Sequence, residues 1–469
     1  MNLGFIVYLI LVRVQTNGSN LLVKSVHKNS KTSSDTLNAL AEMLKGQVGD
    51  CSCSVGTVDH FNNVKVYPRL ASLITKEYFR FYKVNLKKDC PFWSDNSRCA
   101  MRYCSVEHCL DDAPPLIKSY SSRKNQVEDM SVKYLEPYAQ GECDSDLNAE
   151  LGYLNTTISA ATMEEFARWE AFDDALDLYC FYEEDPDAEY VDLLLNPERY
   201  TGYRGYSAHR IWNSIYMENC FRPKHSFDAY IKSSKLNNMC LEKRVFYRVI
   251  SGIHSSINIH LSAKYLLSDI GVINGGGRWG PNLVEFERRF SPETTNGEGP
   301  EWIRNLYFVY LLEMRALAKA APYLEQEEYF TGRHEDDSDT KDAVVNLLQV
   351  IKSFSEHFNE STMFSGGAQA TKLKEEFGLH FRNITAIMDC VGCDKCKLWG
   401  KLQIQGLGTA LKILFSGRFD QPSPSPYSVA NLGKNQFQLD RNEIIALFNA
   451  FARLSTSIYE LEKFRQIMR

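Results

Sequence analysis

Apolar residues recur at steps of three and four over long stretches of the second half of the chain. In Lys243–Leu267 the residues with this spacing are Phe246, Ile250, Ile253, Ile257, Leu261 and Tyr265. Such spacing places apolar side chains on one face of a helix. The same period predicts further helices over Glu301–Ala320, Ala368–Cys390, Leu398–Phe415 and Arg441–Met468.

The last of these helices has the most complete apolar face, formed by Ile444, Phe448, Phe451, Ile458, Leu461 and Phe464. Asp440 precedes it and is a suitable N-cap. The alternation of apolar and polar residues that marks a half-buried strand is scarce, and no repeat of fixed period is present. The sequence therefore predicts a mainly α protein, a single large domain built on a helical bundle core.

The first half of the chain is divided by composition. Residues 1–20 contain a short apolar run that resembles a signal-peptide core, although no positive residue precedes it. Residues 21–50 form a polar leader, and 51–469 the domain itself. Within the domain, residues 110–148 are charged and rich in Ser, which predicts a long loop. A carboxylate-rich helix is expected over Thr162–Tyr182.

Composition excludes several classes of protein. The chain has 469 residues, of which 44% are apolar and 12% aromatic, enough for a large core. With 53 Lys+Arg and 59 Asp+Glu the net charge is −6, and no dense basic block is present, which argues against binding to nucleic acid. No internal apolar run approaches the roughly 20 residues of a membrane-spanning helix.

The chain contains 13 cysteines, a high number for a reducing compartment. Four Asn-x-Ser/Thr sequons occur, at Asn17, Asn155, Asn359 and Asn383. Together these features favour an oxidising lumen. We expect glycosylation at Asn155 and Asn383.

Three cysteines follow one another at intervals of three residues between two predicted helices, at Cys390, Cys393 and Cys396. The run permits a redox-active pair, structural disulfides or a metal site. A metal site needs a fourth ligand, and the Cys-Pro that follows such a run in bacterial ferredoxins is absent. Cys393 and Cys396 at a helix N-terminus, near Lys395 and Lys397, suit a redox pair because the dipole and the lysines stabilise a thiolate. The other two interpretations stay open.

A second group of cysteines lies upstream, at Cys99, Cys104 and Cys109, with Cys90 before it and Cys143 after it. The surrounding residues are polar. Exposed, flexible cysteines exchange disulfides readily, so the group suits thiol–disulfide exchange. An ordinary small disulfide knot is an equally good interpretation of the spacing.

Gly275, Gly277 and Gly280 formally match the dinucleotide-binding fingerprint. That motif requires a strand before it and a crossover helix after it. Here it follows a predicted helix and runs into Pro281. We therefore expect a turn between two helices rather than a nucleotide-binding loop.

Several stretches of the chain also match one known family. They are Phe61-Asn62-Asn63, Tyr67-Pro68-Arg69-Leu70, Tyr82-Lys83-Val84-Asn85-Leu86, Cys90-Pro91-Phe92-Trp93, Tyr190–Tyr203, Asp389–Trp399 and Gln405–Phe415. These stretches resemble the Ero-type oxidoreductins of the endoplasmic reticulum. The resemblance covers nearly everything from Cys51 onward.

The resemblance implies an FAD-dependent thiol oxidase of the endoplasmic reticulum lumen that oxidises protein disulfide isomerase and related thioredoxin-fold proteins. Cys99 and Cys104 resemble the outer shuttle pair, and Cys393 and Cys396 the inner pair beside the flavin. Electrons would pass from the isomerase through the outer and inner pairs to FAD and then to O2, which yields hydrogen peroxide. No metal is implied. Peripheral association with the luminal face of the membrane is compatible with this assignment.

Further site residues follow from the resemblance alone. The implied flavin pocket consists of Arg199, Thr201, Trp212, Ser251, His254 and Arg289. Arginines suit phosphate groups, and an aromatic ring suits stacking. The implied disulfides are the regulatory pairs Cys99–Cys143 and Cys104–Cys109 and the structural pairs Cys90–Cys390 and Cys220–Cys240.

The chain departs from the family pattern at two places. Relatives usually carry a Cys-x-Cys pair upstream of the one that matches Cys51 and Cys53, but residues 1–50 contain no cysteine. The family also commonly places a flavin-contacting arginine where Trp302 stands here, with Arg304 as the nearest substitute. The alternative function is therefore that of a catalytically inactive relative, a disulfide-bonded binding partner of luminal chaperones.

Overall fold

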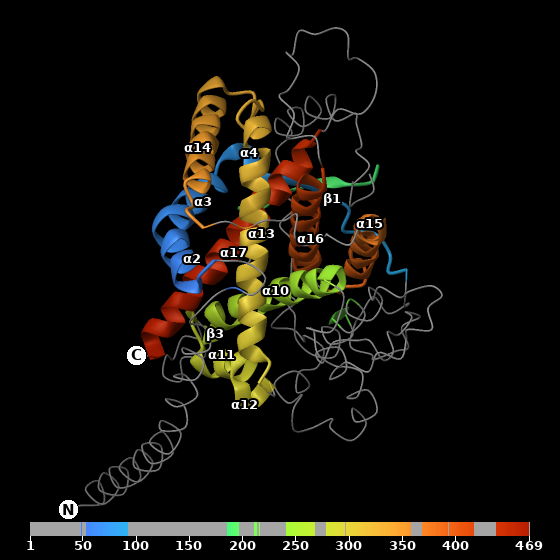
Figure 1. The fold of residues 1–469 in the computed structure, drawn as a ribbon. Coiled ribbons are helices and arrows are strands. Elements are labelled where there is room, and N and C mark those ends of the chain that lie inside the picture. Colours follow the sequence, from blue (N-terminus) through green and yellow to red (C-terminus); the bar gives the residue numbers. More distant parts are fainter. Residues whose placement is uncertain are drawn as a thin grey trace, which may run out of the picture.

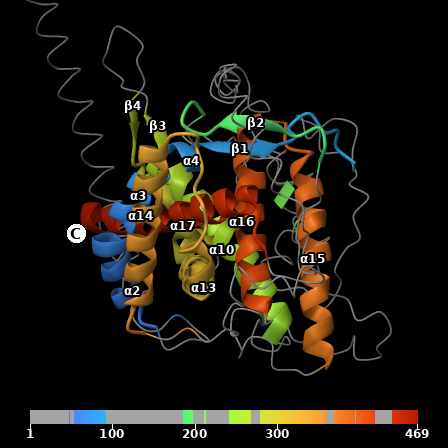
Figure 2. The ribbon, with the colours of Figure 1, turned by 90° about the horizontal axis from the view of Figure 1, so that it is seen from above.

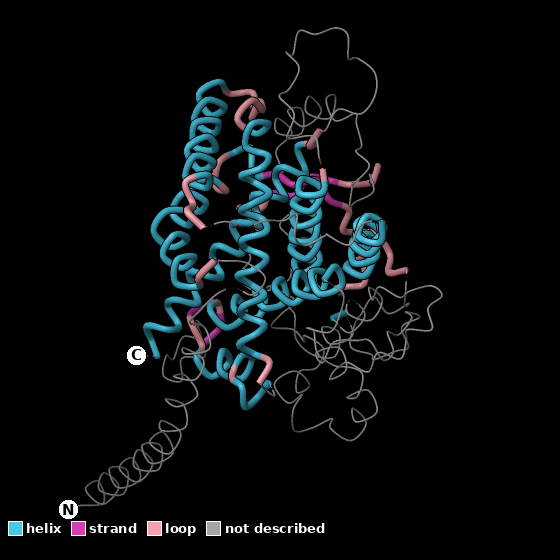
Figure 3. The backbone as a smooth tube through the Cα atoms, in the orientation of Figure 1, coloured by secondary structure: helices cyan, strands magenta, loops and turns pink. Residues whose placement is uncertain are grey.

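The structure, a computed structural model, describes residues 48, 53–91, 185–196, 211–212, 215, 241–267, 278–295, 297–356, 358, 368–392, 394–416 and 438–468. Most of these residues are helical, and the strands in this part of the chain are short (Figure 3). The predicted mainly α bundle is thereby confirmed. The expected loop at 110–148 and the expected helix at Thr162–Tyr182 lie outside the described residues.

Six long helices form the body of the described part of the chain. They are α10 (Leu241–Ala263), α13 (Gly299–Leu324), α14 (His334–Lys352), α15 (Ala368–Met388), α16 (Asp394–Phe415) and α17 (Arg441–Met468). In both Figure 1 and Figure 2, α14, α13, α16 and α15 follow one another in this order across the molecule. The helices α10 and α17 run across them, and the most extensive contacts are those of α16 with α17 and of α10 with α13.

Shorter elements surround this body. The N-terminal ones are α2 (Val55–Phe61), the π-helical turn η1 (Asn62–Val66), α3 (Tyr67–Leu73), α4 (Glu77–Arg80) and β1 (Phe81–Val84). The others are β2 (Glu189–Asp192), β3 (Tyr265–Leu267), β4 (Arg278–Gly280), α11 (Leu283–Phe290) and α12 (Pro292–Thr295). Strand β1 pairs antiparallel with β2, so that Phe81 lies opposite Asp192. The side chain of Arg80 stabilises the pairing of the two strands, because its Nε atom donates to both Asp192 carboxylate oxygens at 2.9 Å and its Nη2 atom donates to one of them at 2.6 Å.

The start of α17 is defined by a reciprocal cap. The Asp440 carboxylate accepts a hydrogen bond from the Glu443 backbone N–H at 2.6 Å, and the Glu443 carboxylate accepts one from the Asp440 N–H at 3.1 Å. This arrangement is a capping box, and it confirms the predicted N-cap. Glu443 also pairs with the buried Lys412 of α16 at 2.8 Å. The cap therefore joins the first turn of α17 to the last turn of α16.

The helix predicted over Lys243–Leu267 is too long at its C-terminus. The structure ends α10 at Ala263, and Tyr265 begins β3, which pairs antiparallel with β4. The expected turn between two helices near Gly280 is therefore wrong, because Gly280 lies in β4 opposite Tyr265. The antiparallel pairing also differs from the parallel strands of a dinucleotide-binding unit.

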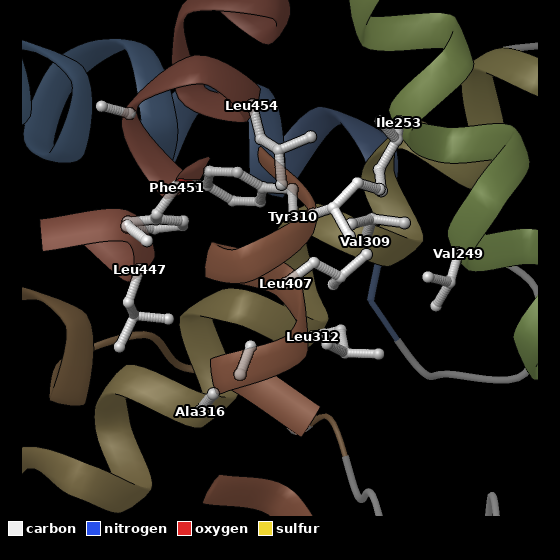
Figure 4. Packing of buried hydrophobic residues seen from close by; sticks show 14 of the residues in the cluster. Val249, Ile253, Val309, Tyr310, Leu312, Ala316, Leu407, Leu447, Phe451 and Leu454 are labelled. Carbon is white, nitrogen blue, oxygen red and sulfur yellow. The ribbon is translucent and has the colours of Figure 1, made fainter. Parts of the chain in front are cut away.

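The core lies where α10, α13, α16 and α17 meet. Figure 4 shows side chains of these helices around Tyr310 and Phe451, whose rings are stacked with centroids 5.1 Å apart. Glycines permit the close approach of the helices. A Cβ atom added at Gly252 of α10 would lie 2.5 Å from the backbone oxygen of Asn305 in α13. One added at Gly406 of α16 would lie 2.8 Å from a backbone carbon of α17.

Candidate functional site

The first part of the site is the connection between α15 and α16. Two backbone hydrogen bonds of 3.0 Å, from the N–H groups of Cys390 and Val391, continue α15 into a tight turn. The helix α16 then begins at Asp394, so that Cys396 lies in its first turn. Cys396 is 1% exposed and is disulfide-bonded. Its partner is not among the described residues, and neither is Cys393, the partner implied by the resemblance.

A second disulfide attaches this turn to the N-terminal part of the domain. Cys90 and Cys390 are joined with a Cα–Cα distance of 4.4 Å and a sequence separation of 300. This bond is the structural pair that the resemblance implies. It brings the segment that follows β1 against the turn, six residues before Cys396.

Two buried lysines of α16 also bind the segment that follows β1. The Nζ atom of Lys397 donates to the backbone oxygen of Leu86 at 3.0 Å, and that of Lys401 donates to the oxygen of Asn85 at 3.0 Å. Lys401 also forms an ion pair with Asp389, one residue before Cys390. Burial lowers the pKa of Lys397 and raises the pKa of Asp389.

The second part of the site lies along α10. The ring of Trp212 is stacked on that of His254, with centroids 3.8 Å apart and planes 13° from parallel. Arg289 of α11 donates to Asn258 at 2.6 Å. Burial and the positive charge of Arg289 together lower the pKa of His254 to about 3. The imidazole is therefore neutral at physiological pH.

A hydrogen-bond network between α10 and α13 fixes these two helices against each other. Asn305 donates from Nδ2 to the hydroxyl of Ser251 at 3.1 Å and accepts from Arg248 Nε at 3.1 Å. The hydroxyl of Ser255 donates to the backbone oxygen of Trp302 at 2.7 Å. The network orients Ser251, and sequence patterns did not indicate it because its members are isolated polar residues inside apolar helices.

The structure thus places four of the six expected pocket residues, Trp212, Ser251, His254 and Arg289, on or beside α10. Ser251 and His254 lie one turn apart on that helix, and Arg289 is close enough to His254 to shift its pKa. Flat neutral rings beside a cation can hold a planar aromatic group that carries phosphate. This donor set fits a flavin dinucleotide.

Other predicted residues lie outside the described part of the chain. They are Arg199, Thr201, Cys99, Cys104, Cys109, Cys143, Cys220, Cys240, Cys393 and Asn155. Cys51 also lies outside it, whereas Cys53 is fully buried. Asn383, the second expected glycosylation site, lies within α15 and is partly buried. Arg304 lies on α13 and pairs with Glu301 at 3.5 Å.

Comparison with known proteins decides the family. Residues 65–461 match the profile described as Endoplasmic Reticulum Oxidoreductin 1. The chain belongs to this family. An Ero1-like protein of Drosophila melanogaster is 53% identical over 441 residues, which cover 91% of this chain and 90% of the relative. The human ERO1-like protein alpha is 44% identical over 472 residues, which cover 96% of this chain and 97% of that protein.

Solved structures of Ero1p agree with this assignment. A double-cysteine mutant of Ero1p has a TM-score of 0.57 and 29% sequence identity, and the match covers 88% of this chain and 98% of that one. A second structure, of Ero1p as the source of disulfide bonds for oxidative protein folding in the cell, has a TM-score of 0.54 at 27% identity, and the match covers 88% of this chain and 98% of that one. This member of the oxidoreductin family is therefore an oxidoreductase of the endoplasmic reticulum that acts in protein folding.

Two kinds of feature are absent from the described residues. None of their helices combines the length and the apolar character that crossing a membrane requires. Nor do these residues include a group of three or more His, Cys, Asp or Glu side chains that could hold a metal ion.

Proposed function

We propose that the chain oxidises reduced protein disulfide isomerase in the lumen of the endoplasmic reticulum, with FAD as cofactor and O2 as the final acceptor. The observation that carries the proposal is the buried, disulfide-bonded Cys396 in the first turn of α16. A disulfide at this position suits electron transfer because the positive end of the helix dipole stabilises a thiolate. Membership in the oxidoreductin family supports the same activity.

Two cysteine pairs share the work in this proposal. Cys99 and Cys104 form the outer pair, which exchanges disulfides with the isomerase. A thiolate of the outer pair then attacks the inner disulfide of Cys393 and Cys396, and the second outer thiolate closes a new outer disulfide. The inner pair is thereby reduced to two thiols and now holds the two electrons that came from the isomerase. Disulfides Cys99–Cys143 and Cys104–Cys109 would withhold the outer thiols, and Cys220–Cys240 would be structural.

Four residues on or beside α10 and two residues outside the described part of the chain would hold the cofactor. Trp212 and the neutral His254 offer ring faces, Ser251 offers a hydroxyl, and Arg289 offers a positive charge. Arg199 and Thr201 would complete the set. Bound FAD supplies a two-electron acceptor that O2 can reoxidise, with hydrogen peroxide as the product. The network through Asn305 keeps Ser251 in place during turnover.

The test uses the purified full chain and three cysteine variants, one of them a double substitution. The parent should show flavin absorbance and consume O2 when reduced isomerase is added. Cys396→Ser should retain the flavin and lose O2 consumption. The double variant Cys99→Ser with Cys104→Ser should retain the flavin and lose oxidation of the isomerase.

Cys180→Ser, at a cysteine with no assigned role, serves as the matched control and should behave as the parent. Continued oxidation of isomerase by the double variant would refute the shuttle assignment. A colourless parent that stays inactive after reconstitution with FAD would refute the oxidase. That outcome favours the inactive chaperone-binding relative, to which the Trp302 departure points.

A further inference from the structure

We propose that a small cavity between α10, α13, α16 and α17 binds one water molecule, which bridges the side chains of Glu313 and Gln403. The cavity is called the core cavity below. Its polar lining residues are Ser256, Glu313, Gln403 and Arg453. The rest of the lining is isoleucine and leucine, including Ile253 and Leu454, which Figure 4 shows in the core. This inference concerns the packing of the helices and does not depend on the proposed function.

The size of the core cavity restricts the ligand to a single heavy atom. The cavity measures about 10 Å³, and a buried water molecule requires roughly 10–15 Å³. Glu313, Gln403 and Arg453 are only 1%, 7% and 7% exposed, so the cavity lies in the interior. The possible ligands are therefore a water molecule and a monatomic ion.

Two polar side chains of the lining call for such a ligand. The Oε2 atom of Glu313 and the Nε2 atom of Gln403 are buried, and neither has a hydrogen-bond partner among the described residues. A buried polar atom that stays unpaired destabilises the folded state, and native cores supply such atoms with a protein partner or an ordered water molecule. Glu313 belongs to α13 and Gln403 to α16, so one ligand can serve both helices.

The charges around the core cavity argue against an ion. The Nε atom of Arg453 donates to the hydroxyl of Ser256 at 3.4 Å, and that hydroxyl is hydrogen-bonded to the hydroxyl of Ser457 at 2.8 Å. Arg453 thereby brings a positive charge to the wall of the cavity, which disfavours a bound cation. An anion is disfavoured by the carboxyl oxygens of Glu313.

A water molecule suits this lining because it both donates and accepts hydrogen bonds. It can accept from the Nε2 atom of Gln403 and donate to the Oε2 atom of Glu313. Buried water molecules make about three hydrogen bonds, and the guanidinium group of Arg453 is a further donor on the same wall. The resulting bridge links α13 to α16 about two turns after Cys396.

A high-resolution crystal structure of the purified full chain tests the site directly. We expect one density peak in the core cavity, about 2.7–3.2 Å from both the Glu313 carboxyl and the Gln403 amide, which are hydrogen-bond distances. A peak about 2.0–2.6 Å from the carboxyl oxygen would indicate a metal ion and would overturn the proposal. A cavity without density, or one closed by direct contact of the two side chains, would overturn it as well.

Unfolding of Gln403→Met in urea gives a second test, whose sign separates a hydrated cavity from a dry one. Methionine has a similar length but no amide donor. If water bridges the two side chains, its loss of a partner should lower the folding equilibrium constant about tenfold. If the cavity is dry, the variant removes an unpaired polar group, so the constant should rise or stay unchanged.

Two further variants serve as controls. Gln349→Met makes the same replacement at an exposed position of α14 and should leave the folding equilibrium constant unchanged. Glu313→Gln keeps an oxygen acceptor and should retain the density peak. If Gln403→Met fails to fold, the crystal structure of the parent still decides the proposal. Neither measurement uses isomerase or O2, so failure of the water site and failure of the proposed function are distinguishable.

Discussion

The crossing of α10 and α13 depends on the absence of a side chain at Gly252. A Cβ atom at this position would lie 2.5 Å from the backbone oxygen of Asn305 and would also collide with the side chain of Val309. The backbone oxygen cannot move without shifting α13. Asn305 also holds Ser251 through its side chain, so a shift of α13 changes the face expected to bind flavin. Gly252→Ala therefore tests whether this close approach is required.

The expected change in the free energy of unfolding of Gly252→Ala is the difference between two opposing effects. Alanine is favoured over glycine in a helix by about 1 kcal/mol. Forcing an extra carbon into a well-packed core costs about 1–3 kcal/mol. Because the collision here involves backbone, the cost should lie near the upper end of that range. We expect Gly252→Ala to lower the free energy of unfolding by about 1–2 kcal/mol.

Urea unfolding of the oxidised protein, followed by circular dichroism, measures this change. The matched control is Gly56→Ala in α2, where an added Cβ meets nothing within 4 Å. That variant should gain about 0.5–1 kcal/mol, because only the helix preference of alanine remains. A Gly252→Ala protein as stable as Gly56→Ala would refute the packing argument.

Three further predictions concern buried groups. Burial raises the pKa of Glu313 well above its usual value, so the folded state binds this proton more tightly and stability is lost as pH rises. Glu313→Gln should therefore flatten the decline of the melting temperature above about pH 5, and an unchanged slope would argue against the burial of this carboxyl group. Replacing Cys90 and Cys390 by Ala removes a disulfide that joins residues 300 positions apart, for which the chain-entropy relation gives about 5–6 kcal/mol of lost stability. A loss below about 1 kcal/mol, measured by unfolding in urea without reductant, would contradict this estimate. Because its pKa is lowered to about 3, His254 should show no NMR titration between about pH 5 and 8. A midpoint at the ordinary value of about 6.5 would oppose the burial argument.

The long apolar helices could be predicted from the sequence because their periodicity persists over many turns. The bounds of α17 agree with the predicted Arg441–Met468. Helix α14 was missed because its first turn contains Glu335, Asp336 and Asp337, and its apolar stripe is confined to the C-terminal half. Acidic residues at a helix start are favourable, so this turn was an available signal. The hairpin of β3 and β4 is too short to show a strand pattern.

The site was predictable to different degrees. The position of Cys396 at the start of a helix followed from the spacing of the cysteines and the following apolar period. Trp212 and His254 could be assigned only from the family resemblance, since isolated aromatic and histidine residues usually belong to a core. The contact of Lys401 with Asn85 joins residues 316 positions apart, and no local pattern indicates it.

The most direct test of the central claim is the stoichiometry of O2 consumption with reduced protein disulfide isomerase. Each disulfide formed in the isomerase releases two electrons and two protons, which reduce one O2 to one hydrogen peroxide. The purified, FAD-loaded chain should therefore consume O2, form isomerase disulfides and produce peroxide in equal amounts, and Cys396→Ser should do none of these. Disulfides formed at the parental rate by Cys396→Ser, or no O2 consumption by the FAD-loaded parent, would contradict the account.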